Sequence, residues 1–193
     1  MIIAIDNFVK DESLLEEIKK DKLFFANPGE YYFWNGWWNE TIVEVPTTKQ
    51  RLIEYIWGEH CPINEVFNVS GFEYWTGIQT ANPELGHKNN LGIHFDKDEA
   101  WFQKTGEIKS PVIGTVYYPD VEDFEGGDLA IYTDGTDKSP EIIKAKPNRL
   151  IIFDAGNVPH EVLEVIKGTR HAIAINLWSE FPYSVEVGAF KSE

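Results

Sequence analysis

Short runs of β-forming residues follow one another at near-regular spacing from residue 63 onward, and this pattern most constrains what the chain can fold into. About eight such runs are separated by Gly, Pro, Asn and Asp: 71–80, 91–95, 111–120, 126–133, 141–146, 149–155, 160–166 and 169–178. Short strands punctuated in this way are typical of sandwiches and barrels. We therefore expect a mainly β (α+β) fold with its β core over 63–190.

The first 60 residues have helical patterning after a short expected strand at 2–8. One helix is expected within 11–25, with Asp11 or Ser13 as its N-cap and an apolar face of Leu14, Leu15, Ile18 and Leu23. A second is expected within 47–60, with Gly58 as its stop signal and an apolar stripe of Leu52, Ile53, Ile56 and Trp57. We expect one domain, 1–193, in which 1–60 is a helical support for the core.

Charge and cysteine content narrow the class of protein. The net charge is −15, and such a surface repels phosphate backbones, so we expect no nucleic-acid partner. Cys61 is the only cysteine, which excludes an intrachain disulfide and fits a reducing compartment. The start of the chain lacks a signal-peptide pattern, and no window approaches the roughly 20 apolar residues of a membrane span. We expect a cytoplasmic protein with no membrane partner, and the sequence does not indicate its oligomeric state.

The stretch GIHFDKDE (92–99) places His94 and Asp96 two positions apart at the expected end of a strand. Residues i and i+2 of a strand point to the same side, so the two side chains would project into one space. An imidazole and a carboxylate that converge from a rigid element suit a metal ion, and two His with one carboxylate are typical of non-haem Fe(II) oxygenases. The alternative is a hydrogen-bonded histidine beside a solvated acidic loop.

A second set of residues lies in NRLIIFDAGNVPHEVLEVIKGTRHAIAINLW (148–178). His160 begins an expected strand, and Arg170 follows ten residues later, just past a hairpin turn expected at Lys167–Gly168. Alternation puts Arg170 on one face with Ala172, Ala174, Asn176 and Trp178. Small residues beside an inward Arg indicate a cavity that holds an anion, whose carboxylate the planar guanidinium grips with two hydrogen bonds. The alternative is an exposed hairpin arginine.

These motifs together resemble the Fe(II)/2-oxoglutarate-dependent dioxygenases, in particular their prolyl-hydroxylase-like branch. That family carries H-x-D, then a distal His, then Arg or Lys about ten residues on, and His94, Asp96, His160 and Arg170 match in order and spacing. The segments TVYYPDVEDFEGGDLAIY and GTRHAIAINLW also resemble family segments, so the resemblance covers roughly residues 70–180. It implies a double-stranded β-helix, or jelly roll.

The resemblance also implies a function and a set of site residues. His94, Asp96 and His160 would hold Fe(II), and Arg170 would pair with the distal carboxylate of 2-oxoglutarate, assisted by the hydroxyl of Tyr118 or, as second candidate, Tyr117. The activity would be hydroxylation of a C–H bond with O2, releasing succinate and CO2. The presence of Asp96 favours hydroxylation, since related halogenases lack this carboxylate. The resemblance leaves ascorbate open as an additional cofactor.

The substrate is less constrained than the chemistry. The branch suggests a prolyl residue of a peptide or protein, and small molecules remain open because one fold serves many substrates. Trp178 and Asn176 could border the substrate pocket. The aromatic stretch YYFWNGWWNE (31–40) is either a stacking surface or core filler. Two alternatives to the oxygenase are a non-catalytic jelly-roll module that binds peptide or carbohydrate, and a cupin-like enzyme that uses another metal.

Overall fold

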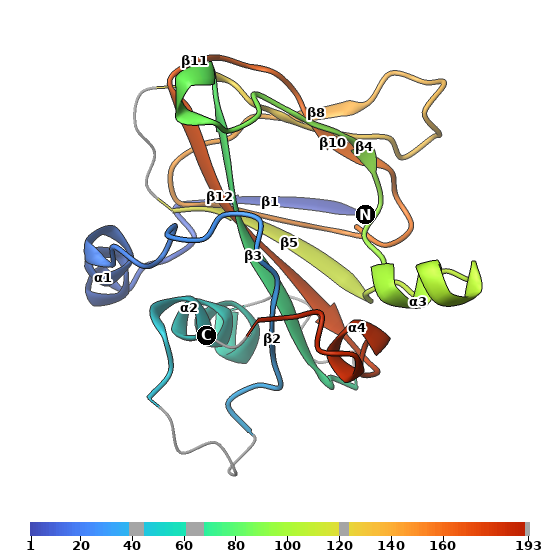
Figure 1. Cartoon of the computed structure of the whole chain (residues 1–193). Coiled ribbons are helices and arrows are strands. Elements are labelled where there is room, and N and C mark those ends of the chain that lie inside the picture. The colour runs from blue at the N-terminus through green and yellow to red at the C-terminus, as the bar shows by residue number, and fades with distance from the viewer. Residues whose placement is uncertain (39–44, 61–67, 120–123, 192–193) are drawn as a thin grey trace.

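Two antiparallel β-sheets lie one above the other in the computed structural model, which describes residues 1–38, 45–60, 68–119 and 124–191 (Figure 1). The larger sheet has the order β1-β9-β5-β12-β3-β2: Ile2–Asp6, Arg149–Phe153, Ile113–Tyr118, Thr169–Trp178, Gly71–Thr80 and Tyr32–Trp34. The smaller sheet has the order β4-β10-β7-β8: Leu91–His94, His160–Val162, Leu129–Ile131 and Glu141–Ile143. The expected mainly β fold is confirmed.

The larger sheet separates two cores, because successive side chains of a strand face opposite sides. On β12, Ile173, Ile175 and Leu177 pack into the core that the helices cover. Ala172 packs into the second core, between the sheets, with residues such as Leu129 of the smaller sheet. The face that carries Arg170 is therefore the inner face of the two-layered β structure.

Helices α1 (Glu12–Lys20) and α2 (Thr48–Glu54) lie on the far side of the larger sheet from the smaller one (Figure 1). Asp11 caps α1 by accepting hydrogen bonds from the backbone of Ser13 and Leu14. The helix ends at Lys20, so the expectation that Leu23 continues its apolar face is wrong, and this side chain is exposed.

A capping box between Thr47 and Gln50 begins α2. Gly58 does not stop this helix, contrary to expectation, because the chain continues as a π-helical turn, η1 (Tyr55–His60). Ile56 and Trp57 within that turn are buried, so packing against the sheet prevails over the weak local preference of one glycine.

The hairpin expected at Lys167–Gly168 is also wrong. The run 160–166 forms two strands, β10 and β11 (Val165–Lys167), and β11 pairs with β6 (Glu125–Gly126). Strand β12 pairs instead with β3 along its whole length and with β5. The chain does turn at Gly168, which has a φ of 69°, but a local turn signal does not specify which strands become neighbours.

Asp98 ties two short helices together at one end of the sheets, α3 (Glu99–Thr105) and α4 (Tyr183–Glu186) (Figure 1). Its buried carboxylate caps α3 at the backbone N–H of Trp101. It also accepts hydrogen bonds from the backbone of Tyr183 and from the backbone and hydroxyl of Ser184. The C-terminal segment is thereby held beside the residues that follow β4. A 3-10 turn, η2 (Pro83–Leu85), lies between β3 and β4.

The aromatic stretch 31–38 is core filler only in part, because Tyr32 and Trp34 are buried whereas Tyr31, Trp37 and Trp38 are 37–44% exposed. Trp37 stacks on Phe72 with ring centroids 5.9 Å apart, and Tyr32 stacks on Tyr74 at 5.6 Å. Tyr31 differs, because it contacts Trp75 on the inner side of β3. Asn39, Glu40 and Cys61 lie outside the described residues. Within the part of the chain that is described, no helix is long and apolar enough to cross a membrane.

Candidate active site

His94, Asp96 and His160 converge between the two sheets. Strands β4 and β10 are antiparallel neighbours with His94 directly opposite His160, and their rings lie 4.3 Å apart. Asp96 follows the end of β4, where its backbone N–H donates to the carbonyl of Ala155. Its Oδ1 lies 3.6 Å from Nε2 of His94 and 3.7 Å from Nε2 of His160. One potential ligand atom from each residue lies within 4.8 Å of the others, as a shared metal ion requires.

Backbone carbonyls orient both imidazoles. Nδ1 of His94 lies 2.8 Å from the oxygen of Gly92, and Nδ1 of His160 lies 3.0 Å from the oxygen of Val158. Because a carbonyl only accepts, each Nδ1 carries the proton and each Nε2 presents a lone pair toward Asp96. Burial lowers the pKa of His160, Asp96 opposes this and His94 adds to it, so the neutral form that binds metal is favoured.

Arg170 is a buried cation that has no anionic partner among the described residues. It is 3% exposed, and no carboxylate of the described residues forms an ion pair with it. Nη1 donates to Oε1 of Gln79 and Nη2 donates to the hydroxyl of Tyr118 at 3.1 Å, whereas the buried Nε has no partner in the described chain. An uncompensated buried charge is costly, so this arrangement indicates that an anionic ligand completes it.

Tyr118 and Tyr117 lie on opposite sides of the larger sheet. Tyr118 faces the space between the sheets, where Arg170 lies against its hydroxyl and over its ring. Tyr117 faces the helices, and its hydroxyl donates to Asn148 at 3.0 Å. The second candidate for the cosubstrate site is therefore contradicted by strand alternation, and Tyr118 alone of the pair reaches Arg170.

The cavity beside Arg170 has the composition expected from β12. Ala172, Ala174 and Asn176 line it together with Arg170, and His94, Asp96 and His160 lie on the same cavity wall. Ala172 and Ala174 leave space that larger side chains would fill. Arg170 and the triad therefore face one space from the two sheets.

Glu73 is a site residue that the sequence reasoning missed. Its side chain points inward from β3, and its Oε2 accepts from Nδ2 of Asn176 at 3.2 Å and from the indole of Trp178 at 3.0 Å. Burial raises the pKa of Glu73 to about 8, with Asp96 adding to the rise and the two hydrogen bonds opposing it. The available signal was the alternation of β3, which puts Glu73, Trp75 and Gln79 on one face.

A second cavity of about 390 Å³ opens beside the triad. His94, Asp96, Asn176 and Glu73 belong to its wall, and its aromatic lining includes Tyr31, Trp75, Phe95 and Phe190. Asn176, which the sequence suggests as a border of the substrate pocket, lies on the wall of this cavity. Trp178 is not part of the lining, because its indole is turned to Glu73.

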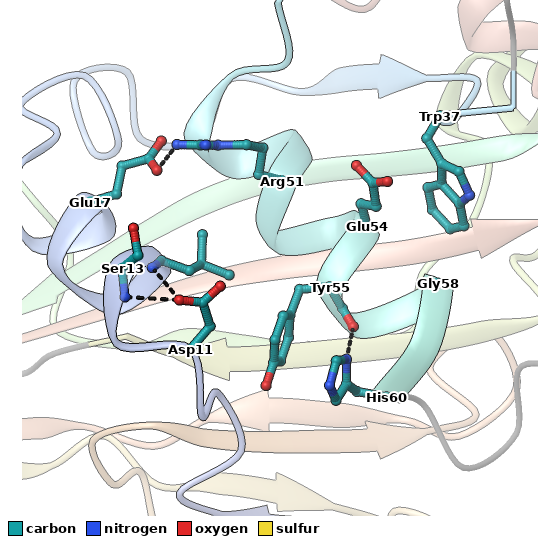
Figure 2. Close-up of a pocket in the computed structure, with 10 residues that line it drawn as sticks. Asp11, Ser13, Glu17, Trp37, Arg51, Glu54, Tyr55, Gly58 and His60 are labelled. Carbon is teal, nitrogen blue, oxygen red and sulfur yellow. Dashed lines mark hydrogen bonds and ion pairs between the residues drawn. The ribbon is translucent and has the colours of Figure 1, made fainter.

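A separate hollow of about 430 Å³ lies on the helical side of the larger sheet (Figure 2). Its wall includes Asp11, Glu17 and Arg51, and Figure 2 shows Arg51 paired with Glu17 across the two helices. The His60 ring stacks on Tyr55 at its edge, with centroids 3.9 Å apart. None of the triad residues reaches this hollow, so the chemistry indicated above belongs to the space between the sheets.

The donor set fits a divalent transition metal with an anionic cosubstrate. Two neutral imidazoles and one carboxylate are the ligands that non-haem Fe(II) sites use, and they leave coordination positions open. Arg170 offers a planar, always charged donor for a carboxylate in the adjoining space.

Comparisons with known proteins agree with this chemistry. The family model for the 2OG-Fe(II) oxygenase superfamily matches residues 78–179, and the chain belongs to that superfamily. It is therefore a 2-oxoglutarate-dependent non-haem iron oxygenase that uses Fe(II), 2-oxoglutarate and O2. Membership favours the oxygenase over the binding-module alternative. Comparison with curated proteins gave no match.

Solved structures share the fold at low sequence identity. A prolyl-4-hydroxylase from Pseudomonas putida is 16% identical with a TM-score of 0.61, over 93% of each chain. A prolyl hydroxylase from Trichoplax adhaerens, in complex with a hypoxia inducible factor oxygen degradation domain peptide, is 15% identical with a TM-score of 0.54, over 95% of this chain and 86% of that one. The protein IDO from Bacillus thuringiensis is 13% identical with a TM-score of 0.55, over 93% and 91%. The expected jelly-roll fold is confirmed.

Proposed function

We propose that the protein hydroxylates a C–H bond of an organic substrate, with Fe(II) held by His94, Asp96 and His160 and 2-oxoglutarate anchored by Arg170. The observation that carries the proposal is that a potential metal triad and a buried guanidinium, which has no anionic partner among the described residues, line one cavity. When bound, Fe(II), 2-oxoglutarate and O2 supply the oxidation, which puts one oxygen atom into the substrate as hydroxyl and the other into succinate, with loss of CO2.

The chain's own residues position the reactants. The carbonyls of Gly92 and Val158 fix the two imidazoles. Asn176 fixes Asp96 by donating to Oδ2 at 3.0 Å, which leaves Oδ1 for the metal. Arg170, with Gln79 and Tyr118 holding its guanidinium, sets the place of the cosubstrate's distal carboxylate. The adjoining aromatic cavity would take the primary substrate and exclude bulk water.

The prolyl residue of a peptide or protein is the substrate that the family resemblance supports, and two of the similar structures are prolyl hydroxylases. It is tested by incubating the Fe(II)-loaded protein with 2-oxoglutarate and proline-containing peptides, with alanine replacements as controls. A mass gain of one oxygen atom on proline, matched by succinate, is the expected result. Hydroxylation elsewhere would reassign the target and leave the reaction class intact.

Thermal unfolding with Mn(II) and the unreactive analogue N-oxalylglycine tests the site without knowledge of the substrate. Both should stabilise the wild type, because a ligand that binds only the folded state raises its stability. Arg170→Ala should keep the response to Mn(II) and lose the further response to N-oxalylglycine, whereas His94→Ala should lose both. Arg51→Ala, which removes a cation on the helical side, is the control. Succinate release that survives His94→Ala and Asp96→Ala would contradict the proposal.

A further inference from the structure

Glu73 is a buried functional group of the aromatic cavity that the proposed chemistry does not use. The metal, the cosubstrate and their supports account for the triad, Arg170, Gln79 and Tyr118. Glu73 contacts none of these directly, is 7% exposed, and lines the cavity of about 390 Å³. Burial of a carboxyl group costs free energy unless the group is paired, so the position of Glu73 requires an explanation.

Only one oxygen of Glu73 is engaged. Both hydrogen bonds, from Asn176 and Trp178, end on Oε2, and Oε1 accepts none from the residues that the structure describes. The same Asn176 nitrogen also donates to Asp96, so Glu73 lies two hydrogen bonds from a metal ligand. A group bound to Glu73 in this cavity would share the cavity with His94 and Asp96, which belong to the same wall.

Aromatic rings line the same cavity as this carboxyl group. Trp75 and Tyr31 lie with ring centroids 4.9 Å apart, and Phe190 lies 6.4 Å from Tyr31. Aromatic faces attract a cation, and more strongly where water is excluded. A carboxylate with such walls is a suitable site for a protonated amine, since one side offers charge and the other offers ring faces.

The charges of the site also favour a cationic substrate group. With Fe(II) and 2-oxoglutarate bound, the metal, Asp96, the two cosubstrate carboxylates and Arg170 cancel one another. Lys97 on the cavity wall is already matched by Glu99 at 2.8 Å. Ionised Glu73 is then the uncompensated charge among the described residues of the cavity, and a cationic substrate group restores neutrality.

The raised pKa values of Tyr31 and Glu73 are consistent with a negatively charged cavity. Burial, followed by Glu73, Asp96 and Glu99, raises the pKa of Tyr31 to about 12. Without a cation, burial also makes Glu73 hold its proton near neutral pH. An ammonium group at Oε1 opposes that effect, because an opposite charge nearby favours the ionised carboxylate.

We propose that Glu73, as a carboxylate, binds a protonated amine of the primary substrate in the cavity walled by Tyr31, Trp75 and Phe190. The inference rests on the proposed oxygenase function and names the substrate class: a molecule with a free amino group, either a free amino acid or the amino terminus of a peptide. The amine chemistry is common to both sources, and the test separates them.

The test measures ligand binding to protein loaded with Mn(II) and N-oxalylglycine, by calorimetry or tryptophan fluorescence. The probes are free L-amino acids, short peptides with a free amino terminus, and N-acetylated forms of both. At least one amine probe should bind, and its acetylated form should bind about tenfold or more weakly, as expected for loss of a charge-assisted hydrogen bond. Binding of amino acids but not peptides, or the reverse, identifies the source. The bound probe should also stimulate succinate release in the Fe(II) enzyme.

Glu73→Gln distinguishes a carboxylate from a neutral hydrogen-bonding group. Glutamine keeps the size of the side chain but cannot pair with an ammonium, so amine affinity should fall about tenfold or more. Glu107→Gln removes an equal charge from an exposed position outside the cavity and should have no effect. Equal binding of free and acetylated probes, full affinity in Glu73→Gln, or no binding of any amine would overturn the inference. Retained stabilisation of that variant by Mn(II) and N-oxalylglycine would show that the proposed function stands independently of it.

Discussion

Asn176 Nδ2 lies 3.0 Å from Asp96 Oδ2, so a side-chain amide holds the carboxylate of the metal triad. The same nitrogen donates to Glu73, which links the metal ligand to the substrate cavity. Asn176 sits on β12, whose pairing with both β3 and β5 leaves its position little freedom. The orientation of Asp96 therefore depends on the centre of the larger sheet as well as on β4.

Asn176→Ala should weaken metal binding about tenfold to a hundredfold, the range typical when a group that orients a metal ligand is removed. Calorimetric titration with Mn(II) measures the affinity. Asn157→Ala is the control, because Asn157 is exposed and, among the residues that the structure describes, its side chain bonds only to Asp154. Unchanged affinity in Asn176→Ala would mean that β4 alone fixes Asp96.

Tyr118→Phe should raise the Michaelis constant for 2-oxoglutarate severalfold and leave Mn(II) affinity unchanged. The change removes the hydroxyl that accepts from Arg170 and keeps the ring beneath the guanidinium. Succinate release as a function of 2-oxoglutarate concentration gives the constant. Tyr117→Phe is the matched control, because it removes a hydroxyl one residue away that faces the helical core. A similar rise in both variants would argue against a specific role for Tyr118.

Strands could be predicted from the sequence where the composition and alternation of a single run of residues are typical of a strand. The runs 71–80 and 169–178 are β3 and β12 with the expected bounds, and their alternation placed Arg170 and Asn176 on the inner face correctly. The metal triad and Arg170 could also be selected from spacing, because the family motif fixes their order along the chain.

The sequence does not specify which strands pair or which polar side chains are buried. The Lys167–Gly168 turn looks like a hairpin, yet β11 pairs with β6, because the choice of partner depends on the packing of the whole sheet. In the sequence, Glu73 has the pattern of an ordinary polar residue in a strand. Its burial is visible only in the structure, where Asn176 and Trp178 of β12 donate hydrogen bonds to its carboxylate. Local periodicity contains no information about which residues meet across strands.

The stability of the metal-free protein should depend on pH through Glu73. Burial raises its pKa from 4.5 to about 8, with Asp96 and Asp98 adding to the rise, so the folded state binds this proton more tightly than the unfolded chain. Its contribution is fully present below pH 4.5 and is lost as the pH rises to about 8. One pKa unit corresponds to about 1.4 kcal/mol, so the loss amounts to a few kcal/mol.

Urea unfolding of the wild type and Glu73→Gln across this pH range, with chelator present, measures the effect. The free energy of unfolding of the variant, relative to the wild type, should increase as the pH rises, because glutamine cannot ionise. The corresponding difference for Glu107→Gln should stay flat. A flat difference for Glu73→Gln as well would mean that Glu73 is ionised at little cost in the folded protein.

Gly114→Ala should destabilise the protein by about 1–3 kcal/mol, the usual cost of overpacking a core. A Cβ at this position would lie 2.4 Å from the Cβ of Ala155 and 3.0 Å from Oδ1 of Asn176. The variant should also bind Mn(II) more weakly, because Asn176 must move. Gly58→Ala, on the helical side, puts the added Cβ no closer than 3.6 Å to another atom and serves as the control in both measurements. Equal behaviour of the two variants would show that the space around Asn176 is looser than the structure indicates.

Asp98→Ala should release the C-terminal segment from the cavity. The change leaves the part-buried N–H of Tyr183 and the buried N–H of Ser184 without their acceptor, at a cost of about 1–3 kcal/mol. Faster proteolytic cleavage within 182–191 is the expected readout, with Asp137→Ala in an exposed turn as the control. Equal cleavage rates would mean that other contacts, such as that of Lys191 with Tyr31, suffice to hold the segment.

The most direct test of the account is an anomalous diffraction map from crystals grown with Mn(II) and N-oxalylglycine. We predict one strong peak within coordination distance of Nε2 of His94, Oδ1 of Asp96 and Nε2 of His160, with the far carboxylate of N-oxalylglycine against the guanidinium of Arg170. A peak at other residues, or an analogue that leaves Arg170 without an anionic partner, would contradict the assignment of this cavity as the oxygenase site.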